Sequence, residues 1–301
     1  MGKNDKVKAS DIANFLNAKL FGKNINIENA VPIHSLSPNS LSFVKKFEDS
    51  YINLINENHN SLIICNEEYK DKIKSSFIIS DNPRLDFLRV IKEFFTSEHD
   101  TGIHPTANVH PDSKIGKKVF IGAHVNIGPE VSIGDNTIIE HNVVIMGKVI
   151  FGKGCVVKSN SVIGAEGFGF EYNEYGIPEH FPHIGSIEIG DNVWIGACST
   201  IERATIDRTI ISSNVKIDDL VQVGHNCFIG NNTLIMAGSI ICGGAKIGSN
   251  CWIAPNTSIK EKLKLGDNAF TGLGAVVIND VPNNTKMVGN PAKELKKPVR
   301  K

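Results

Sequence analysis

Three features that mark specialised classes of protein are missing from this sequence. Its 301 residues carry 32 acidic and 32 basic side chains, so the charge balance indicates no nucleic-acid partner. No apolar run approaches the roughly 18 residues of a membrane-spanning helix, and the first residues lack the basic and apolar regions of a signal peptide. No two of the six cysteines are spaced Cys-x-x-Cys, which argues against zinc ligation and disulfides. We therefore expect a cytoplasmic protein without membrane insertion, metal or permanently bound cofactor.

What the sequence does contain is a strict period of six between residues 115 and 163. Every sixth residue is aliphatic or aromatic: Ile115, Ile121, Ile127, Ile133, Ile139, Ile145, Phe151, Val157 and Ile163. Small or β-branched residues recur four places later: Val119, Val125, Val131, Thr137, Val143, Val149, Cys155 and Ser161. Neither a helix nor an amphipathic strand has this period, so the pattern predicts a solenoid. Three hexads would form one triangular turn of short parallel strands, with the aliphatic residue inside and the glycine that often follows it at a corner.

The period is interrupted twice and then resumes. Residues 165–186 show no period of six and predict a loop that projects from one edge of the solenoid, and a slip of four residues follows at 204–208. From Ile211 the period runs to about Val277, which gives roughly eight coils in all. Cys227 is one of three cysteines that fall on the inward small-residue position, where a thiol acts as apolar filler.

The first hundred residues have a different texture, typical of a small α/β module. Two helices are predicted, over 10–22 with Ser10 as N-cap and over 81–95 with Asp81 as N-cap. Three short apolar runs between them predict strands at 41–44, 61–65 and 77–80. The expected buried side of the second helix is Leu85, Leu88, Ile91 and Phe95.

His225 is the candidate for chemistry in the repeat region. It stands two places after the inward Val223, just past a corner, and so outside the core. A neutral imidazole there can accept a proton from an attacking amine. His141 holds the same repeat position, so position alone does not distinguish His225 from a surface histidine that bonds to water. The difference lies one 18-residue coil further on, where His141 is followed by Ser159 and His225 by Gly243 of a Gly-Gly pair, whose backbone N–H suits an oxyanion hole.

Three segments of the chain resemble the UDP-3-O-acylglucosamine N-acyltransferases of lipid A synthesis. They are residues 164–170, 201–204 and 215–226. The resemblance covers about residues 7–258, and the N-terminal module is similar to the uridine-binding domain of that family. It implies a mainly β fold, a left-handed parallel β-helix, that assembles as a homotrimer with active sites between neighbouring copies.

The same resemblance implies roles for single residues. His225 would be the catalytic base, Asp218 would orient it, and Gly243 would supply the oxyanion N–H. The domains then follow as an α/β nucleotide-recognition domain over 1–100, a β-helix over 101–279 with the 165–186 insertion, and a basic tail over 280–301.

The end of the chain resembles a different group, the CoA-dependent hexapeptide acetyltransferases. The similarity lies in residues 274–282 and 288–293. In those relatives this region holds CoA, which implies a cofactor site here formed by Gly274, Ala275, Lys286, Asn290, Pro291 and Lys293. An acyl-CoA donor is therefore expected in preference to an acyl-carrier-protein donor.

Aromatic residues are the candidates for contact with the acceptor substrate. Phe43 and Tyr51 in the N-terminal module could stack on a nucleobase, although packing alone would also explain both rings. In the 165–186 insertion we expect Phe168, Phe170 and His183 to contact the substrate.

These observations predict an N-acyltransferase that moves an acyl group from a thioester to the amine of a nucleotide-linked amino sugar. One alternative is the lipid A enzyme proper, a UDP-3-O-(3-hydroxyacyl)glucosamine N-acyltransferase that uses hydroxyacyl carrier protein. A sugar O-acyltransferase and a non-catalytic solenoid scaffold also remain open. The sequence alone does not identify the sugar, the nucleotide base or the length of the acyl chain.

Overall fold

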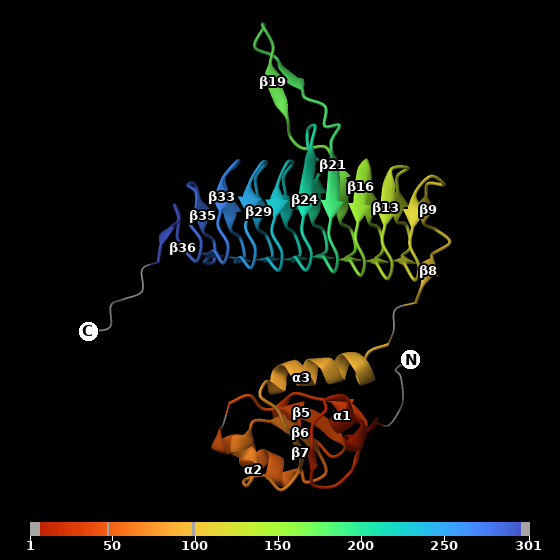
Figure 1. Cartoon of the computed structure of the whole chain (residues 1–301), viewed down its shortest axis with the longest axis vertical. Coiled ribbons are helices and arrows are strands. Elements are labelled where there is room, and N and C mark those ends of the chain that lie inside the picture. The colour runs from red at the N-terminus through yellow and green to blue at the C-terminus, as the bar shows by residue number, and fades with distance from the viewer. Residues whose placement is uncertain (1–6, 47, 98–99, 296–301) are drawn as a thin grey trace, which may run out of the picture. The chain divides into compact units, whose positions relative to one another are not determined.

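The computed structural model describes residues 7–46, 48–97 and 100–295. It divides into two compact units, Met1–His99 and Asp100–Lys301 (Figure 1). The first unit is an α/β domain and the second is built almost entirely from short parallel strands. No helix in the described ranges is long and apolar enough to cross a membrane.

The first unit is a five-stranded sheet with helices packed on both faces. Its strands lie in the order β2-β7-β6-β5-β4, and all neighbours are parallel except β2 and β7. The elements are β1 (Val7–Lys8), α1 (Ala9–Phe15), β2 (Leu20–Phe21), β3 (Asn26–Ile27), β4 (Asn29–Ala30), η1 (Ile33–Ser35), β5 (Ser40–Phe43), α2 (Asp49–Glu57), β6 (Leu62–Cys65), η2 (Glu67–Tyr69), β7 (Ser76–Ile79), α3 (Pro83–Val90) and η3 (Ile91–Phe95).

The central strand β6 explains why this unit needs helices on both sides. Leu62 and Ile64 belong to the cluster that includes residues of α1 and α3, whereas Ile63 and Cys65 pack with Ile55 of α2. Successive side chains of a strand point to opposite faces, so a wholly apolar strand must be covered on both. The three predicted strands are present as β5, β6 and β7.

The first predicted helix is shorter than expected. α1 begins after Lys8 and ends at Phe15, so Ser10 is not its N-cap. Asn17 adopts a left-handed conformation, with a φ of 49°, and the chain then enters β2 at Leu20. The apolar residues near 20 belong to the sheet, which a periodicity argument within one helix does not reveal.

The second predicted helix exists, and Phe95 of its expected buried side packs on the core, but Leu85 and Leu88 do not. Leu85 is 39% exposed and Leu88 is 57% exposed, while Val90 is fully buried and Phe87 packs on the core. The helix carries two apolar stripes, and only the position of the sheet selects between them. Asn82, not Asp81, caps it by accepting a hydrogen bond from the backbone N–H of Leu85. The whole of α2 was not predicted.

The second unit is a left-handed parallel β-helix, as predicted, with three sheets as the sides of a triangular prism. The eight-stranded sheet contains β10 (Lys114–Ile115), β13 (Val131–Ile133), β16 (Lys148–Phe151), β21 (Ser186–Ile189), β24 (Arg208–Ile211), β27 (Phe228–Ile229), β30 (Lys246–Ile247) and β33 (Lys264–Leu265). The nine-stranded sheet contains β9 (Asn108–Val109), β12 (Asn126–Ile127), β15 (Val144–Ile145), β18 (Val162–Ala165), β23 (Thr200–Glu202), β26 (Gln222–Val223), β29 (Ile240–Ile241), β32 (Ser258–Ile259) and β35 (Val276–Val277).

The third sheet has eleven strands and extends furthest at both ends. It contains β8 (Gly102–Ile103), β11 (Phe120–Ile121), β14 (Ile138–Ile139), β17 (Val156–Val157), β22 (Trp194–Ile195), β25 (Lys216–Ile217), β28 (Leu234–Ile235), β31 (Trp252–Ile253), β34 (Phe270–Thr271), β36 (Lys286–Val288) and β37 (Lys293–Glu294). The nine strands of the second sheet correspond to nine coils, one more than predicted, because β8 and β9 begin the solenoid before the strict period starts.

The strand register gives the coil length and both interruptions. A regular coil has 18 residues, since Phe120 pairs with Ile138 (138 − 120). Lys148 pairs with Ser186, a separation of 38, so the insertion adds 20 residues to one coil. Ser186 pairs with Arg208, a separation of 22, which confirms the slip of four residues.

The interior follows the predicted period. Every sixth residue from Ile121 to Ile163 is at most 3% exposed, and the small residues four places later are at most 5% exposed. Their stacked side chains form one continuous core through the solenoid. Each such aliphatic side chain contributes about 1.5–3 kcal/mol by its removal from water.

The predicted reason for the glycines is wrong, because asparagines form most of the left-handed corners. Asn136, Asn142 and Asn160 have φ values of 58°, 59° and 65°. Gly134 lies outside the left-handed region, but a side chain there would come within 2.4 Å of the backbone oxygen of Gly152 on the next coil. These glycines are required by the close approach of neighbouring coils.

Two segments depart from the regular prism. The insertion forms an antiparallel hairpin of β19 (Phe170–Tyr172) and β20 (Pro178–His180), which projects from one edge of the β-helix (Figure 1). The expected tail from residue 280 instead closes the end of the solenoid, since β36 pairs with β34 and β37 folds back on β36. Its last residues, 296–301, lie outside the described residues.

Candidate active site

His225 lies at the corner of the β-helix that follows β26, half-buried between the nine-stranded and the eight-stranded sheets. Its backbone N–H donates to Oε2 of Glu202 at 3.1 Å, and its ring packs edge-on against His183 with 5.1 Å between the centroids. A side chain on Gly243, one coil further on, would come within 2.6 Å of Nε2 of His225. The Nε2 atom therefore faces the backbone of Gly243, as the sequence predicted.

The hydrogen bonds of Asn226 determine which ring nitrogen of His225 carries the proton. Oδ1 of Asn226 accepts a hydrogen bond from the backbone N–H of Thr205 at 3.1 Å. A backbone N–H can only donate, so the amide oxygen must face this way. The same oxygen lies 2.9 Å from Nδ1 of His225, and Nδ1 must then be the donor. The neutral ring keeps its lone pair on Nε2, which is the nitrogen that faces Gly243.

The backbone N–H of Gly243 has no acceptor among the described residues. At an equivalent corner, the N–H of Ser249 donates to Asp267 at 2.7 Å, because the side chain one coil further on bends back as a cap. The residue in that position beyond Gly243 is Glu261, whose carboxylate lies 3.9 Å from Nζ of Lys260 instead. The Gly243 N–H is consequently available to an oxyanion.

His141, at the same repeat position as His225, has a different task. Its Nδ1 accepts a hydrogen bond from the backbone N–H of Ala123 at 2.9 Å. The ring of His141 is therefore one of the corner caps that tie successive coils together. His225 makes no such cap, so the structure separates the two histidines that repeat position could not distinguish.

Glu202 and Asn226 are the site residues to which sequence reasoning assigned no role. Glu202 is 8% exposed. Its Oε1 accepts a hydrogen bond from Nε2 of Gln222 at 3.1 Å, and its Oε2 accepts one from the backbone N–H of His225. Gly167, at the base of the insertion, lies so close that a side chain there would meet both Glu202 and His225. The signal was available, because Glu202 and Asn226 stand inside two of the segments that carry the family resemblance.

Cys242 precedes Gly243 in the chain, but it is not a suitable nucleophile. Burial raises the pKa of its thiol, and the negative charges of Glu261 and Glu202 raise it further. A protonated thiol is a poor nucleophile. His225 therefore remains the candidate for chemistry at this corner.

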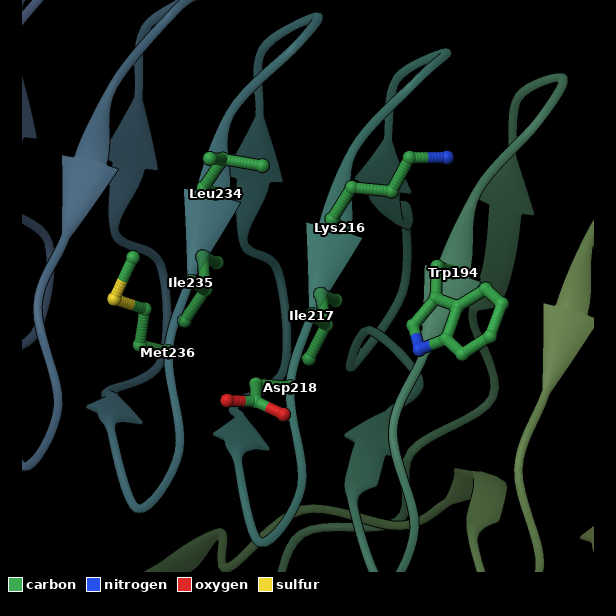
Figure 2. Close-up of a pocket in the computed structure, with 7 residues that line it drawn as sticks. All are labelled: Trp194, Lys216, Ile217, Asp218, Leu234, Ile235 and Met236. Atoms are coloured by element: carbon green, nitrogen blue, oxygen red, sulfur yellow. The ribbon is translucent and has the colours of Figure 1, made fainter. Parts of the chain in front are cut away.

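Asp218 does not meet His225 within a single chain. It follows β25, one corner before β26, so the whole of β26 separates the two side chains. Figure 2 shows its carboxylate in a pocket on the eleven-stranded sheet, near Trp194 and Met236. No contact between Asp218 and His225 occurs among the described residues, and Asn226 occupies Nδ1 instead.

The insertion residues predicted to bind substrate are in two different environments. Phe168 is 86% exposed and Phe170 is 47% exposed, and their rings lie 4.8 Å apart on the hairpin, where a ligand can reach them. His183 is 1% exposed, because the returning segment packs beneath the insertion against His225. This burial gives no support to direct contact of His183 with substrate, which stays a prediction.

The predicted CoA site lies at the C-terminal end of the solenoid. Five of its six residues are exposed there: Gly274, Lys286, Asn290, Pro291 and Lys293. Ala275 is fully buried and its N–H donates to the carbonyl of Gly272, and its role in the cofactor site stays a prediction. It occupies an inward small-residue position, which the motif resemblance did not separate from the surface.

The two aromatic residues of the N-terminal unit are partly buried. Phe43, on β5, packs against Phe87 with 4.8 Å between the ring centroids, and Tyr51 packs in the cluster around Ile55 of α2. Packing accounts for these contacts, and stacking on a nucleobase stays a prediction.

Comparison with known proteins places this site in context. The family model "Bacterial transferase hexapeptide (six repeats)" matches residues 130–165 and 226–261. The chain carries the hexapeptide repeat of bacterial transferases. The second match includes Asn226 and Gly243, and it begins one residue after His225.

Similar curated proteins carry one name. The UDP-3-O-acylglucosamine N-acyltransferase of Campylobacter lari is 44% identical over 108 residues, which cover 35% of this chain and 33% of that protein. The enzyme of the same name from Chlorobium chlorochromatii is 52% identical over 88 residues, which cover 29% of this chain and 24% of that protein. The chain thus spans a third or less of the length of these two relatives.

Similar solved structures share the hexapeptide-repeat architecture. LpxA from Acinetobacter baumannii is 25% identical with a TM-score of 0.59, covering 64% of this chain and 73% of that chain. The UDP-N-acetylglucosamine acyltransferase of Francisella novicida is 28% identical with a TM-score of 0.58, covering 64% and 68%. These similarities support the β-helical fold of the second unit.

Proposed function

We propose that this protein is an N-acyltransferase that transfers an acyl group from a thioester donor to the amine of a UDP-linked amino sugar. The observation that supports it most directly is the pairing at one corner of two groups that acyl transfer needs. These are Nε2 of His225, which carries the lone pair of the neutral ring, and the N–H of Gly243, which has no acceptor among the described residues. A non-catalytic scaffold would need neither.

The geometry supports the following sequence of steps. The sugar amine attacks the thioester carbonyl carbon, Nε2 of His225 takes the proton from the amine, and the carbonyl oxygen becomes an oxyanion that the Gly243 N–H stabilises. Collapse of this intermediate breaks the C–S bond, and the proton on His225 passes to the departing thiolate. An amide and a free thiol result, so atoms and charge balance. Oδ1 of Asn226 accepts from Nδ1–H both before the proton transfer, when it fixes the tautomer, and after it.

The names of the relatives favour the lipid A alternative for the acceptor. The curated relatives are called UDP-3-O-acylglucosamine N-acyltransferases, and the structural relative from Francisella novicida is named for UDP-N-acetylglucosamine. Both names contain a UDP-linked glucosamine, so we propose a UDP-glucosamine derivative as the acceptor in place of a dTDP-sugar. On the β-helix, its sugar would bind near the exposed Phe168 and Phe170.

The two predicted functions differ in the thioester that donates the acyl group. Lys286 and Lys293 are exposed at the C-terminal end of the solenoid, as an acyl-CoA site would require, and we retain acyl-CoA as the proposed donor. The acyl-carrier-protein alternative makes a different kinetic prediction. If CoA is the donor, Lys293→Ala should raise the KM for acyl-CoA and leave the KM for the sugar nucleotide unchanged. A carrier-protein substrate preferred by about 100-fold or more, which is about 2.7 kcal/mol, would overturn the CoA assignment.

A homotrimer is part of this proposal, because one face of the prism is apolar on its outer side. Paired residues along the eleven-stranded sheet make a ladder of outward side chains: Phe120, Ile138, Val156, Trp194, Lys216, Leu234, Trp252 and Phe270. Lys216 is the one charged residue between Phe120 and Phe270, beyond which the ladder continues to the exposed Lys286, and a second copy would cover the apolar side chains. Asp218 lies beside this face, so we propose that it reaches His225 only from a neighbouring copy.

The decisive experiment replaces His225 and uses His141 as its matched control. His225→Ala should lower kcat by about 10²- to 10⁴-fold, the usual contribution of a general base. His141→Ala removes a histidine at the same repeat position and should lower stability without lowering kcat by more than a few-fold. Equal turnover by the parent and His225→Ala would contradict the catalytic proposal and favour a scaffold.

The same assay distinguishes N-acylation from O-acylation, which the UDP-N-acetylglucosamine acyltransferases among the structural relatives keep open. With a label on the acyl group of the donor, alkaline hydroxylamine leaves the label on an amide product and releases it from a sugar ester. Acceptors with and without a free amine complete the comparison. Release of the label would replace the N-acyltransferase proposal by an O-acyltransferase.

A further inference from the structure

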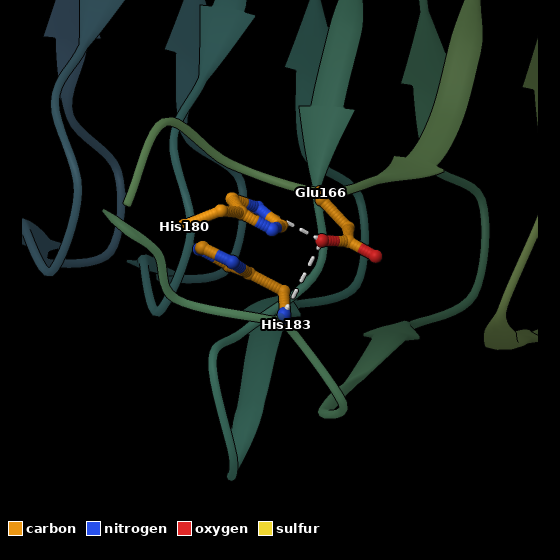
Figure 3. Close-up of side chains that lie close together, drawn as sticks. All are labelled: Glu166, His180 and His183. Atoms are coloured by element: carbon orange, nitrogen blue, oxygen red, sulfur yellow. Dashed lines mark hydrogen bonds and ion pairs between the residues drawn. The ribbon is translucent and has the colours of Figure 1, made fainter. Parts of the chain in front are cut away.

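The stem of the insertion brings together three side chains that suit a metal ion. Glu166 directly follows β18, His180 ends β20, and His183 lies on the segment that returns to the β-helix (Figure 3). One ligand atom from each residue lies within 4.8 Å of the others. We propose that these residues bind a divalent transition-metal ion, zinc in the first instance, which clasps the stem of the hairpin to the β-helix.

His183 supplies the independent observation. Its side chain is 1% exposed, and its Nδ1 lies 2.9 Å from the carbonyl oxygen of Phe181. A carbonyl only accepts, so Nδ1 carries the hydrogen and the lone pair is on Nε2. That Nε2 is buried and has no hydrogen-bond partner among the described residues. A buried acceptor without a partner costs free energy, and an ion is one explanation for it.

The surroundings of the cluster match those of known histidine ligands. A metal-bound histidine usually donates its second ring N–H to a carbonyl or carboxylate, as His183 does to Phe181. Arg203 fixes the other ligand by donating to Oε1 of Glu166, and it also donates to the carbonyl of His183. Oε2 of Glu166 lies 3.1 Å from Nε2 of His180 and also accepts a hydrogen bond from the backbone N–H of His183 at 3.4 Å (Figure 3).

The donor set indicates the class of metal. Two neutral imidazoles and one carboxylate favour zinc and similar borderline ions over magnesium or calcium, which prefer oxygen ligands. The absence of a Cys-x-x-Cys pair has no bearing on such a site. Its ligands come from positions 166, 180 and 183, whose spacing became meaningful only when the hairpin closed.

The clasp would act on the neighbouring active site through packing. His183 contacts the ring of His225, and Gly167 follows Glu166 directly against the same ring. A bound ion would fix both ends of the stem and so hold this wall of the site in place. The inference concerns metal binding alone and holds whatever reaction His225 performs.

The test measures zinc bound to the full-length protein after chelator treatment and addition of zinc chloride alone. We expect one zinc per chain, and with cobalt chloride the d–d absorption of a nitrogen- and oxygen-ligated site. His180→Ala and Glu166→Gln should each abolish stoichiometric binding. His110→Ala is the matched control, because His110 and His180 both have side chains that are 45% exposed, and it should bind like the parent. His180 is on the surface, so this variant folds even if a His183 variant does not.

Two further measurements make the outcome specific. Zinc should slow proteolytic cleavage of the β19–β20 hairpin in the parent but not in His180→Ala. His225→Ala should still bind zinc, since His225 is not a proposed ligand. Absence of stoichiometric binding, equal binding by the His180 and His110 variants, or loss of zinc in His225→Ala would each overturn the proposed site.

Discussion

Asn226 shows how one side chain serves both the fold and the chemistry. Its φ of 59° makes the corner that every coil needs, and asparagine tolerates that conformation better than most residues. Its amide oxygen also accepts hydrogen bonds from the backbone N–H and the hydroxyl of Thr205 and from Nδ1 of His225. The orientation of the catalytic candidate is therefore built into the turn that follows it.

The first prediction concerns this residue. Asn226→Ala should lower kcat by about 10- to 100-fold with little change in KM, because the imidazole loses the group that fixes its tautomer and orientation. Asn226→Asp keeps an oxygen acceptor and should restore most of the activity. Steady-state kinetics of both variants, with circular dichroism to confirm folding, would check it. Equal loss of activity in the two variants would point to damage to the corner instead.

The cysteines give a second prediction at the scale of single residues. Burial raises the pKa of the Cys227 thiol from 9.0 to about 12, whereas Cys198 is exposed. A thiol reagent at pH 8 should therefore modify Cys198 in the native protein and reach Cys227 only after unfolding. Because the folded-state pKa is raised, Cys227 stabilises the fold below pH 9.0, and this contribution declines as the pH rises toward about 12. Denaturant midpoints of the parent and Cys227→Ala across that range would measure the difference.

At the scale of the coil, asparagine and glycine have different structural roles. Asparagines take the left-handed φ, and glycines allow the next coil to approach, as Gly134 does toward Gly152. Gly243 belongs to the second group, because any side chain would strike Nε2 of His225. The same steric rule that stacks the coils thus opens the candidate oxyanion hole.

The third prediction tests the corner role at Asn214, whose φ is 62° and whose side chain is exposed. Asn214→Ala should lower the free energy of unfolding by about 1 kcal/mol, since a β-carbon is unfavourable in this conformation. Asn214→Gly removes the β-carbon and should change it by a few tenths of that amount. Denaturant unfolding would compare the two. A larger loss for glycine than for alanine would show that the asparagine side chain, and not its φ, matters.

At the scale of the whole molecule, the outer face of the eleven-stranded sheet is the proposed contact between copies. Trp252 is 41% exposed in that ladder, and Phe228, on the eight-stranded sheet, is 39% exposed. The two are similar in apolar character and exposure but lie on different sides of the prism. They therefore form a matched pair for testing which side meets another copy.

The fourth prediction follows from this pair. Trp252→Glu should convert the proposed trimer to monomer, because a charge buried in an apolar interface has no partner there. Phe228→Glu should leave the oligomeric state unchanged. Sedimentation or light scattering would measure both. A monomeric parent protein would contradict the trimer and, with it, the contribution of Asp218 from a neighbouring copy.

The sequence by itself determined the β-helix, because a period of six repeats the same steric requirement in every coil. The inward positions, the insertion and the slip of four residues all followed from counting, and His225 and Gly243 were found as neighbours by adding one coil length. The buried side of α3 was harder to predict, because nothing repeats along a single short helix. Its sequence has two apolar stripes, and only packing on the sheet buries Val90 and leaves Leu88 exposed.

Only the tertiary structure decided how the site is assembled around His225. The insertion returns at a point no period specifies, so the burial of His183 and its approach to Glu166 depend on how the hairpin closes. The tautomer of His225 likewise depends on the backbone N–H of Thr205, from the preceding coil. Asp218 and His225 are seven residues apart in sequence but stand at different corners, because a strand of the prism lies between them. Periodic contacts repeat along the chain and can be counted, whereas contacts between a loop and a corner exist only once the chain has folded.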